Sequence, residues 1–442
     1  MHHALTQNFC FYLMAFMSPR AAASDPAPSG TSMPTATPAA GVRSTRAMGP
    51  TGSVVLLASI LIAFMAASSA PTPLYSIYRE AWGFSPITLT VVFGIYAFSL
   101  LFSLLTVGAL SDYVGRRPVV LAAVALQAVA MLLVILANDV PMLIAARVVQ
   151  GLATGAAMSA LGAALLDVNR TWGALINSVM PIVGMAIGAL GSSVLVQFAP
   201  APLHLVYVVL LVVLLVQGVI TFFLPETVRP QPGALASLRP KVRVPAQARR
   251  ALMMVAPVDV AVWALGGFFL SLGPTLARVV TGEQAPVVGG LLVFTLTICG
   301  AASVMAFRNT EARRTMNIGA AALIVGMSTV LVGVHTHASL WFFAGTMIAG
   351  VGFGAAFLGA VRTVMPMALP HERAGLMAAF YVLSYFAMSL PAMVAGALVG
   401  QIGLIPTTDI YGAAVILLAT AALIGSMTLR PVVPHGSTLP SR

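Results

Sequence analysis

Residues 108–118 read Gly-Ala-Leu-Ser-Asp-Tyr-Val-Gly-Arg-Arg-Pro, a short polar stretch between two long apolar segments. Gly108 and Gly115 allow close backbone approach and a tight turn, because glycine has no β-carbon. Asp112 can sit near a helix N-terminus, where negative charge is favourable. Arg116 and Arg117 place positive charge at the end of an apolar segment, as cytoplasmic ends of membrane helices do. The stretch therefore predicts a cytoplasmic loop between two membrane helices.

The composition excludes a soluble domain. Hydrophobic residues make up 59% of the 442 residues and charged residues only 7%, whereas soluble domains carry about 25% charged residues. Mean hydropathy is +0.99. A helix needs about 20 apolar residues to cross the hydrocarbon of a membrane. Segments of this kind predict twelve membrane helices, at 52–75, 86–110, 118–137, 140–165, 172–197, 203–224, 251–276, 285–307, 317–335, 339–362, 374–401 and 407–429.

The net charge of +11 would suggest a nucleic-acid ligand in a soluble protein, but here its distribution has another cause. With the N-terminus inside, only Arg79 and Arg278 of the 22 cations fall outside, and Arg147 lies within a span. Membrane proteins concentrate lysine and arginine in cytoplasmic loops. The chain is therefore expected to be a multi-pass protein of the cell (inner) membrane with both termini in the cytoplasm and no nucleic-acid partner. The cations assigned to the cytoplasm are Arg20, Arg43, Arg46, Arg116, Arg117, Arg170, Arg229, Arg239, Lys241, Arg243, Arg249, Arg250, Arg308, Arg313, Arg314, Arg362, Arg373, Arg430 and Arg442.

The sequence divides into two membrane halves with polar segments before, between and after them. Residues 1–50 are rich in Ala, Pro, Ser and Thr and are expected to be a disordered cytoplasmic tail, with Met33 and Met48 as alternative starts. Six helices over 51–224 are followed by a proline-rich cytoplasmic loop at 225–250. Six more helices over 251–430 precede a cytoplasmic tail at 431–442.

The two halves resemble each other in sequence. Gly115-Arg116-Arg117-Pro118 matches Ala312-Arg313-Arg314-Thr315, and the Gly151 to Gly155 segment matches Gly350 to Gly354 at nearly the same offset. Pro71-Thr72 and Pro274-Thr275 close the first helix of each half. Internal repeats of this kind build the two halves of secondary transporters, which move around a central site.

With these features, residues 108–118 resemble the loop between helices 2 and 3 of major facilitator superfamily transporters. Arg147-Val-Val-Gln150-Gly151 is similar to the family's R-x-x-Q-G motif of helix 4. The resemblance covers about residues 51–430. It implies an all-α integral membrane protein with twelve transmembrane helices in two pseudo-symmetric six-helix bundles. Within the family it points to the drug:proton antiporter-like branch, whose members work by alternating access. Members of the family are usually monomers.

Two buried ionisable residues are the candidates for proton coupling. An arginine near mid-membrane, such as Arg147, costs at least about 2.5–3.5 kcal/mol and must face partners or water. The resemblance associates its motif, with Gln150, Gly151 and Gly155, with proton coupling. Asp259 is the acidic residue deep within a predicted span, where a carboxyl favours its protonated form unless a cation pairs with it. The alternatives are that Arg147 only braces helix contacts and that Asp259 forms a static ion pair, with Arg147 as one partner.

The resemblance assigns residues 108–118 to gating. In the family, the counterpart of Asp112 latches the outward-facing state through contacts with neighbouring helix ends, and Gly108, Gly115, Arg116 and Arg117 complete the motif. The second half keeps the arginines but has Asn309 in place of the carboxylate. Asp167 is interpreted as a helix-end charge. In the fifth span, Gly184 and Gly188 fit an antiporter motif, whereas Ala189 replaces its proline and close helix packing is an equal explanation.

The remaining candidates concern the ligand. Tyr96, Trp263, Tyr381 and Tyr385 are expected to line a cavity for a hydrophobic or cationic small molecule, since aromatic rings stack and attract cations. His335 and His337 lack a third ligand and make no metal site. Cys10 and Cys299 indicate neither a disulfide framework nor redox chemistry. No Walker loop is present, so neither a cofactor nor ATP drive is predicted.

The sequence thus predicts a secondary transporter, not an enzyme, which exchanges protons for a small hydrophobic or cationic compound that it exports. Proton-coupled uptake of a small metabolite is the alternative that the incomplete motif of the fifth span leaves open. A membrane-embedded enzyme or a channel is more distant. An enzyme would need a catalytic cluster at one depth, and a channel would need rings of polar residues along a continuous path. The repeat and the loop motif favour a carrier.

Overall fold

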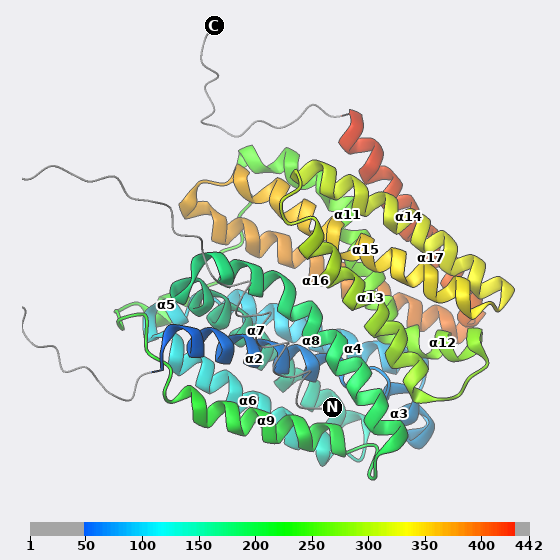
Figure 1. The fold of residues 1–442 in the computed structure, drawn as a ribbon, viewed down its shortest axis with the longest axis horizontal. Helices are drawn as coiled ribbons and strands as arrows, with labels where there is room; N and C mark the ends of the chain where they lie inside the picture. The colour runs from blue at the N-terminus through cyan, green and yellow to red at the C-terminus, as the bar shows by residue number, and fades with distance from the viewer. Residues whose placement is uncertain (1–47, 429–442) are drawn as a thin grey trace, which may run out of the picture. The chain divides into compact units, whose positions relative to one another are not determined.

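The computed structural model describes residues 48–428, which belong to one compact unit spanning residues 46–442. Residues 1–47 of the predicted tail at 1–50, and the predicted tail at 431–442, lie outside the described residues. The regular elements within the described range are helices (Figure 1). The long ones are α2 (Pro50–Ser69), α4 (Pro86–Val107), α6 (Arg116–Ile135), α7 (Val140–Val168), α8 (Arg170–Phe198), α9 (Leu205–Thr221), α11 (Ala246–Ser271), α13 (Pro286–Ala306), α14 (Ala312–Thr336), α15 (Ser339–Val364), α16 (Arg373–Ile402) and α17 (Leu404–Thr428).

These helices confirm the predicted membrane architecture. Eleven of the described helices are long and apolar enough to cross a membrane. The remaining predicted span, the sixth at 203–224, corresponds to α9, whose 17 residues lie at the lower limit for crossing. The protein is therefore a multi-pass membrane protein with an all-helical fold.

Short helices continue or connect the long ones. The first and seventh predicted spans are each broken: α2 is followed by α3 (Tyr75–Trp82), and α11 by α12 (Gly273–Thr281). Both breaks fall at the prolines that the sequence repeat pairs, Pro71 and Pro274, because proline lacks the amide that continues a helix. The other short elements are α5 (Ser111–Val114), α10 (Ala234–Ser237), η1 (Met365–Met367) and η2 (Pro370–Glu372).

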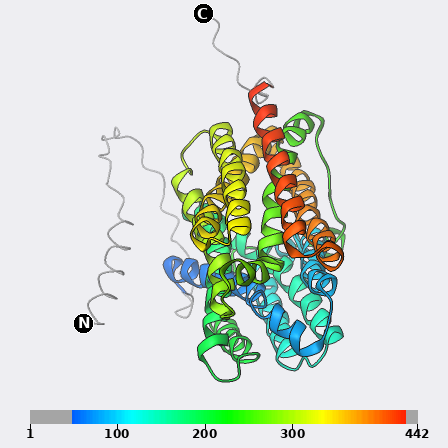
Figure 2. The same cartoon turned by 90° about the vertical axis from the view of Figure 1, so that its right-hand side faces the viewer.

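Buried apolar side chains gather into two large clusters, one dominated by α2–α9 and the other by α11–α17. In Figures 1 and 2 the helices drawn blue to green and those drawn yellow to red occupy different sides of the membrane unit. Each set is a six-helix bundle. The bundles meet where α4 packs on α16 and α8 packs on α13, so residues from both sequence halves face one another along these contacts.

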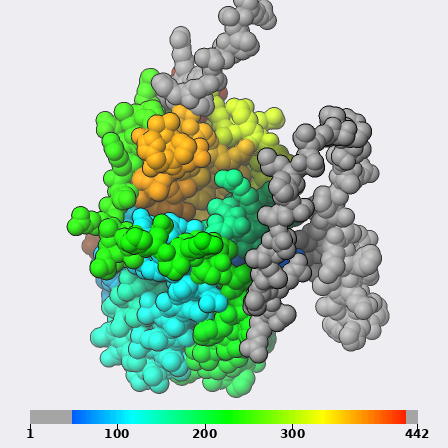
Figure 3. Space-filling view, turned by 90° about the vertical axis from the view of Figure 1, so that its left-hand side faces the viewer, coloured from blue at the N-terminus to red at the C-terminus, as the bar shows by residue number. Residues whose placement is uncertain are grey.

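We call the face on which α2 begins and α17 ends the proximal face, and the opposite face the distal face. In Figure 1, α5 lies towards the proximal side, and α3 and α12 lie towards the distal side. The segment between the bundles crosses the proximal face, where Figure 3 shows its green atoms lying over the cyan atoms of the first bundle. This segment contains α10.

Candidate functional site

The broken end of α2 leaves three backbone carbonyls without their usual helical donors. Pro71 has no amide for Ala67 O, and the amide of Thr72 bonds to Ser69 O instead of Ser68 O. The amide of Leu74 bonds to Pro71 O and leaves Ala70 O open. Such groups cannot stay unpaired inside a membrane, where each costs several kcal/mol. Side chains from two other helices must therefore satisfy them.

Arg147, Gln150 and Ser192 supply these donors. Arg147 Nη1 donates to Ser68 O at 3.3 Å, and Gln150 Nε2 donates to Ala67 O at 2.9 Å. Ser192 Oγ donates to Ala70 O at 2.7 Å. A cation at a helix C-terminus is also favoured by the helix dipole. Arg147 and Gln150 therefore cap the end of α2, a contact that sequence reasoning did not identify.

The guanidinium of Arg147 is enclosed on its other sides. It donates to Gln150 Oε1 and lies over the ring of Tyr96, with Cζ 4.1 Å from the ring centroid. Arg147 is fully buried, and its Nε lacks a hydrogen-bond partner in the described structure. Among the described residues Arg147 and Asp259 do not form an ion pair, so the alternative of a static Arg147–Asp259 pair is wrong. Of the predicted cavity residues, Tyr96 is thus the one that accompanies Arg147.

Gly151 and Gly155 bring α7 against α4. A β-carbon at either position would lie 2.4 Å from a carbonyl oxygen of α4, that of Tyr96 or that of Leu100. The second half repeats this contact: β-carbons at Gly350 and Gly354 would lie 2.5 and 2.1 Å from the carbonyl oxygens of Leu296 and Gly300 on α13. The paired glycines of the sequence repeat thus make the same helix contact in both bundles.

Asp259 occupies the middle of α11 and is fully buried. Its Oδ2 lies 2.9 Å from the hydroxyl of Ser384 on α16. The indole N–H of Trp263, one helical turn further along α11, faces the same carboxyl, but among the described residues neither Nε1 nor Asp259 Oδ1 makes a hydrogen bond of normal geometry. A buried acceptor and a buried donor that both lack partners are suited to a water or ligand group that lies between them.

Aromatic rings surround this carboxyl. Trp263 packs against Tyr385 at a centroid distance of 5.2 Å and against Phe357 at 5.6 Å, and Tyr381 lies 6.1 Å from Tyr385. The structure therefore brings together three of the four predicted cavity residues, Trp263, Tyr381 and Tyr385. All four pack into the cluster of buried residues that joins α4 to α16. These rings are tilted or edge-on to one another, and an aromatic face beside a carboxyl can bind a flat or cationic group.

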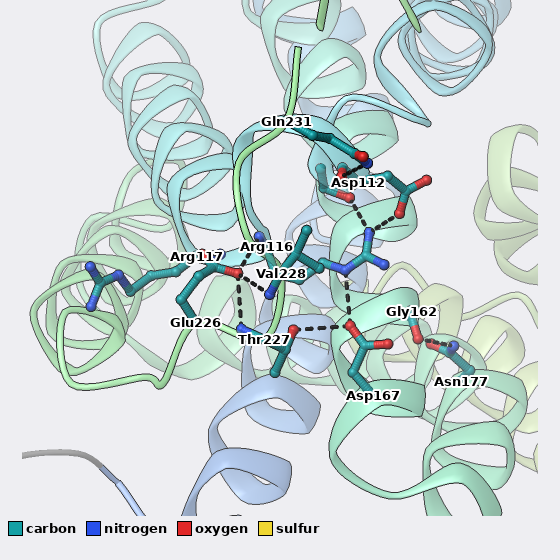
Figure 4. Close-up of polar contacts among 11 residues, drawn as sticks. Asp112, Arg116, Arg117, Gly162, Asp167, Asn177, Glu226, Thr227, Val228 and Gln231 are labelled. Carbon is teal, nitrogen blue, oxygen red and sulfur yellow. Dashed lines mark hydrogen bonds and ion pairs between the residues drawn. The ribbon is translucent and has the colours of Figure 1, made fainter. Parts of the chain in front are cut away.

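The loop of residues 108–118 forms a charged cluster on the proximal face (Figure 4). Arg116 lies between two carboxylates: its Nη1 pairs with Asp112 of α5, and its Nε donates to Asp167 Oδ2 at 3.0 Å. Asp167 lies at the end of α7, as the sequence indicated, but its pairing with Arg116 was not predicted. Arg117 points elsewhere and donates to Phe222 O at the end of α9, at 3.2 Å.

Glu226 fixes this loop from the central segment. Its carboxylate oxygens accept from the backbone amides of Arg116 at 2.8 Å and Arg117 at 3.0 Å, the first residues of α6. Gly115 precedes them with φ of 104°, and a β-carbon there would lie 2.6 Å from Glu226 Oε2. Gly115 therefore makes the predicted tight turn. Gly108 ends α4 and begins the turn of residues 108–110 in an ordinary right-handed conformation, so this turn does not depend on a positive φ.

Further contacts extend the cluster along the central segment. Thr227 Oγ1 donates to Asp167 Oδ2 at 3.0 Å, and Gln231 Nε2 donates to Asp112 O at 2.9 Å. The backbone amide of Gln231 also donates to the backbone carbonyl of Tyr113. Sequence reasoning treated residues 225–250 as a solvated loop and missed these contacts. The carboxylate of Glu226, directly after Pro225 at the end of a span, was the available signal.

The distal ends of the two bundles are joined. Arg278 Nη1 of α12 lies 3.7 Å from Glu80 Oε1 of α3, and Gln197 Oε1 accepts from the amide of Val287 at 3.2 Å. A β-carbon at Gly396 would lie 2.1 Å from Thr90 Oγ1, which shows how closely α16 approaches α4 near the distal face. The structure therefore has the bundles in contact at their distal ends.

Gly184 and Gly188 of the fifth predicted span pack on α2. β-carbons there would lie 2.7 Å from Ile62 O and 2.2 Å from Ala66 O. Helix packing, one of the two explanations offered for these glycines, therefore accounts for both of them.

Comparison with known proteins identifies the class. Residues 55–392 match the sequence profile of the Major Facilitator Superfamily. The chain belongs to this family of membrane transporters, which confirms the predicted resemblance.

Particular relatives are more distant. The multidrug transporter MdfA of Yersinia pestis bv. Antiqua (strain Angola) and that of Yersinia pestis (strain D106004) are each 27% identical over 279 residues. The match spans 58% of this chain and 65% of each relative, so the chain covers just under two thirds of their length. Among solved structures, the nucleoside transporter NupG is similar with a TM-score of 0.65 at 12% identity, covering 86% of this chain and all of NupG. A point mutant of NupG gives a TM-score of 0.66 at 14% identity, over 84% of this chain and 99% of that one. At these identities the likeness shows the fold.

Proposed function

We propose that this transporter exchanges protons for a small hydrophobic or cationic compound and exports that compound by alternating access. The observation that carries the proposal is the carboxyl of Asp259, fully buried in the second bundle near aromatic rings, with one oxygen lacking a hydrogen bond among the described residues. The partial similarity to proteins named multidrug transporters supports export. The partners would be a small-molecule substrate and protons, and a single copy of the chain would carry out transport as a monomer.

Asp259 would bind the proton and the substrate in turn. An ionised carboxylate in an apolar site needs a positive partner, and a proton or a cationic substrate can each provide it. Trp263 and Tyr385 would hold the apolar part of the compound. Arg147 contributes to coupling in this proposal by holding the end of α2 beside Tyr96.

The energetics are sufficient for export. A proton that moves down a potential of 100 mV releases about 2.3 kcal/mol, and each unit of pH difference adds about 1.4 kcal/mol. For an uncharged compound, one proton per molecule can therefore support a concentration gradient of about 50-fold from the potential alone. Exchange of one proton for one monovalent cation moves no net charge, so the pH difference alone drives it. Larger gradients follow when a pH difference is present.

The proposed orientation places the proximal face in the cytoplasm. The cations of residues 116, 117, 170 and 229 all lie at helix ends or in the central segment on this face, as the distribution of arginine in membrane proteins requires. The distal ends, joined by Glu80 and Arg278, would then face outward and be closed. In this orientation the cluster of Asp112, Arg116 and Asp167 governs the cytoplasmic gate, and Gly108, Gly115 and Arg117 shape its loop.

The test is proton exchange in everted membrane vesicles that contain the protein and have an acidified interior. Lipophilic cations, antibiotics and small metabolites are added in turn while the pH difference is recorded. We expect some lipophilic cations to collapse it, and we expect this response to be lost in Asp259→Asn and in Arg147→Ala. Val394→Ala, at an exposed position of the same helix as Tyr385, is the matched control.

Two results would contradict the proposal. A compound-dependent response that persists in Asp259→Asn would remove this carboxyl from coupling. Accumulation of a metabolite in right-side-out vesicles together with protons, with no response in everted ones, would establish the alternative of proton-coupled uptake.

A further inference from the structure

The hydroxyl of Ser384 lies within hydrogen-bond distance of two oxygen atoms, but it has a single proton to donate. Its Oγ lies 2.9 Å from Asp259 Oδ2 and 3.0 Å from Phe380 O, one turn back along α16. Ser384 is fully buried. The carbonyl of Phe380 can only accept a hydrogen bond, and an ionised carboxylate can also only accept. The single proton of the hydroxyl therefore cannot serve both contacts at full strength while Asp259 is ionised.

Protonation of Asp259 resolves this conflict. When a proton binds Oδ2, the carboxyl changes from charge −1 to neutral and becomes a donor towards Ser384 Oγ. The hydroxyl then turns its own proton to Phe380 O, and both contacts are satisfied. When the proton leaves, the hydroxyl turns back and donates to the carboxylate, a charge-assisted bond of about twice the strength of a neutral one. Only O–H bonds are made and broken in this step.

We propose that Ser384 is a positioning residue that couples the protonation of Asp259 to α16. Its hydroxyl donates to the carboxylate when Asp259 is ionised and to Phe380 O when Asp259 is protonated. The inference rests on the proposed proton coupling at Asp259 and names the residue through which α16 responds to it. α16 also carries Tyr381 and Tyr385 and packs on α4 of the other bundle. The switch therefore lies on a helix that joins the aromatic site to the contact between the bundles.

The other groups around Asp259 do not compete for this role. The titratable groups on the helices that pack against α11 at this site are Tyr381 and Tyr385 of α16, Tyr411 of α17 and Tyr96 of α4. Tyr411 donates to Ala264 O at 2.9 Å and is engaged there. From α15, Phe357 approaches Trp263. Within residues 48–428 no arginine, lysine or second carboxylate is bonded to Asp259.

The first measurement uses infrared spectroscopy on the purified full-length protein, without any substrate. The band of the protonated carboxyl is assigned by its loss in Asp259→Asn. In Ser384→Ala we expect this band to move to higher frequency, because the carboxyl loses its hydrogen-bond partner. We also expect the pH at which half of the band is lost to rise by about one unit, since the ionised form loses its stronger bond. Ser384→Thr, which keeps the hydroxyl, should restore both values.

Ser389→Ala provides a matched control on the same helix. Ser389 is fully buried like Ser384, but its hydroxyl has no hydrogen-bond partner in the described structure. This variant should leave the band and its pH midpoint unchanged. A general effect of removing a buried hydroxyl from α16 would instead shift the band in both alanine variants, and this would overturn the proposal.

The second measurement records compound-driven proton exchange in the same vesicles for wild type and Ser384→Ala. We expect the pH midpoint of exchange to move in the same direction as that of the infrared band. An unchanged infrared band in Ser384→Ala overturns the role of Ser384, whatever the transport result. A shifted band in a protein that never exchanges protons instead overturns the proposed function and leaves the hydrogen bond established.

Discussion

Arg147 and Asp259, the fully buried arginine and aspartate of the described residues, differ in what their contacts join. Arg147 of the first bundle donates to Ser68 O and Gln150 and lies against the ring of Tyr96. Asp259 of the second bundle bonds to Ser384 and faces the indole N–H of Trp263, and its Oδ1 has no hydrogen bond of normal geometry among the described residues. A side chain that caps a helix end holds structure in place. A group with an open position can bind something that comes and goes.

The repeat sharpens this contrast. The position of the second bundle that matches Arg147 is Thr346, whose hydroxyl donates to Phe342 O within its own helix, α15. The glycine contacts beside these two positions are nevertheless the same in both bundles. The bundles thus share their packing and differ in their buried charges, which indicates that the charges carry the distinct tasks of the two halves.

The largest effect is expected for Asp259→Asn, measured as transport. The carboxamide keeps the size and can still accept from Ser384, but it can neither ionise nor exchange a proton. Binding of a cationic compound should fall by about 10-fold to 100-fold, because a bond to a charged group contributes about 1.5–3 kcal/mol. The melting temperature in detergent should stay the same. A melting temperature that falls by as much as in Arg147→Ala would remove the distinction between the two residues.

The next largest effect is expected for Arg147→Ala, measured as stability. The substitution leaves Ser68 O without a donor and removes the cation from the end of α2, which together should lower the free energy of unfolding by about 2–4 kcal/mol. Arg147→Lys should recover part of this loss, since lysine keeps the charge but lacks the planar donor geometry. Thermal unfolding followed by a fluorescent thiol or tryptophan signal measures both. If Arg147→Ala lost transport while its stability was unchanged, Arg147 would act in coupling alone.

Smaller losses of stability are expected at the other two donors to the end of α2. Gln150→Ala and Ser192→Ala should each cost about 1–2 kcal/mol, because each leaves one buried carbonyl unpaired. Gln150→Ala also removes an acceptor of Arg147. The stability losses of the two single variants, Gln150→Ala and Arg147→Ala, should therefore sum to more than the loss in the double variant. Strict additivity in this double-mutant cycle would show that Arg147 and Gln150 do not act as one cap.

The smallest effect is expected for Glu80→Gln. The pair with Arg278 joins α3 to α12 at 3.7 Å, and Glu80 is 66% exposed, so the pair should contribute less than about 1 kcal/mol. Labelling of a cysteine placed at Thr90 should rise slightly in this variant, as the distal ends separate more often. Labelling that rises by about tenfold or more, equivalent to about 1.4 kcal/mol, would make this pair a principal distal closure.

The sequence predicted the helices well because apolar length decides membrane crossing. Each predicted span has an observed helix at nearly the same residues, and the breaks after α2 and α11 fall at prolines that were already paired as repeats. In the candidate site, the sequence singled out Arg147, Asp259 and the aromatic residues. Ionisable side chains are costly inside a membrane helix and therefore indicate a function. The sequence did not predict the partners of these residues. The side chains that donate to the end of α2 lie 79 to 122 positions further along the chain.

The missed partners share a physical cause. Ser192 and Ser384 are ordinary helix serines in the sequence, and only the neighbouring helix reveals which carbonyl or carboxyl each one meets. Glu226 lies in a segment rich in proline and charge, where composition predicts solvation. Contacts between helices depend on rotation and depth, which hydrophobic periodicity leaves open in helices that are apolar on all sides.

The central segment ends in two fixed attachments. Gln231 bonds to Asp112 and Tyr113 of the first bundle, and the amide of Arg243 donates to Gly375 O of the second bundle at 3.2 Å. The chain between these anchors can extend to at most about 40 Å. It is therefore a tether of finite length, whose reach limits how far the proximal ends can part while both attachments hold. Deleting residues from this stretch would shorten the stroke of the transporter without touching either bundle.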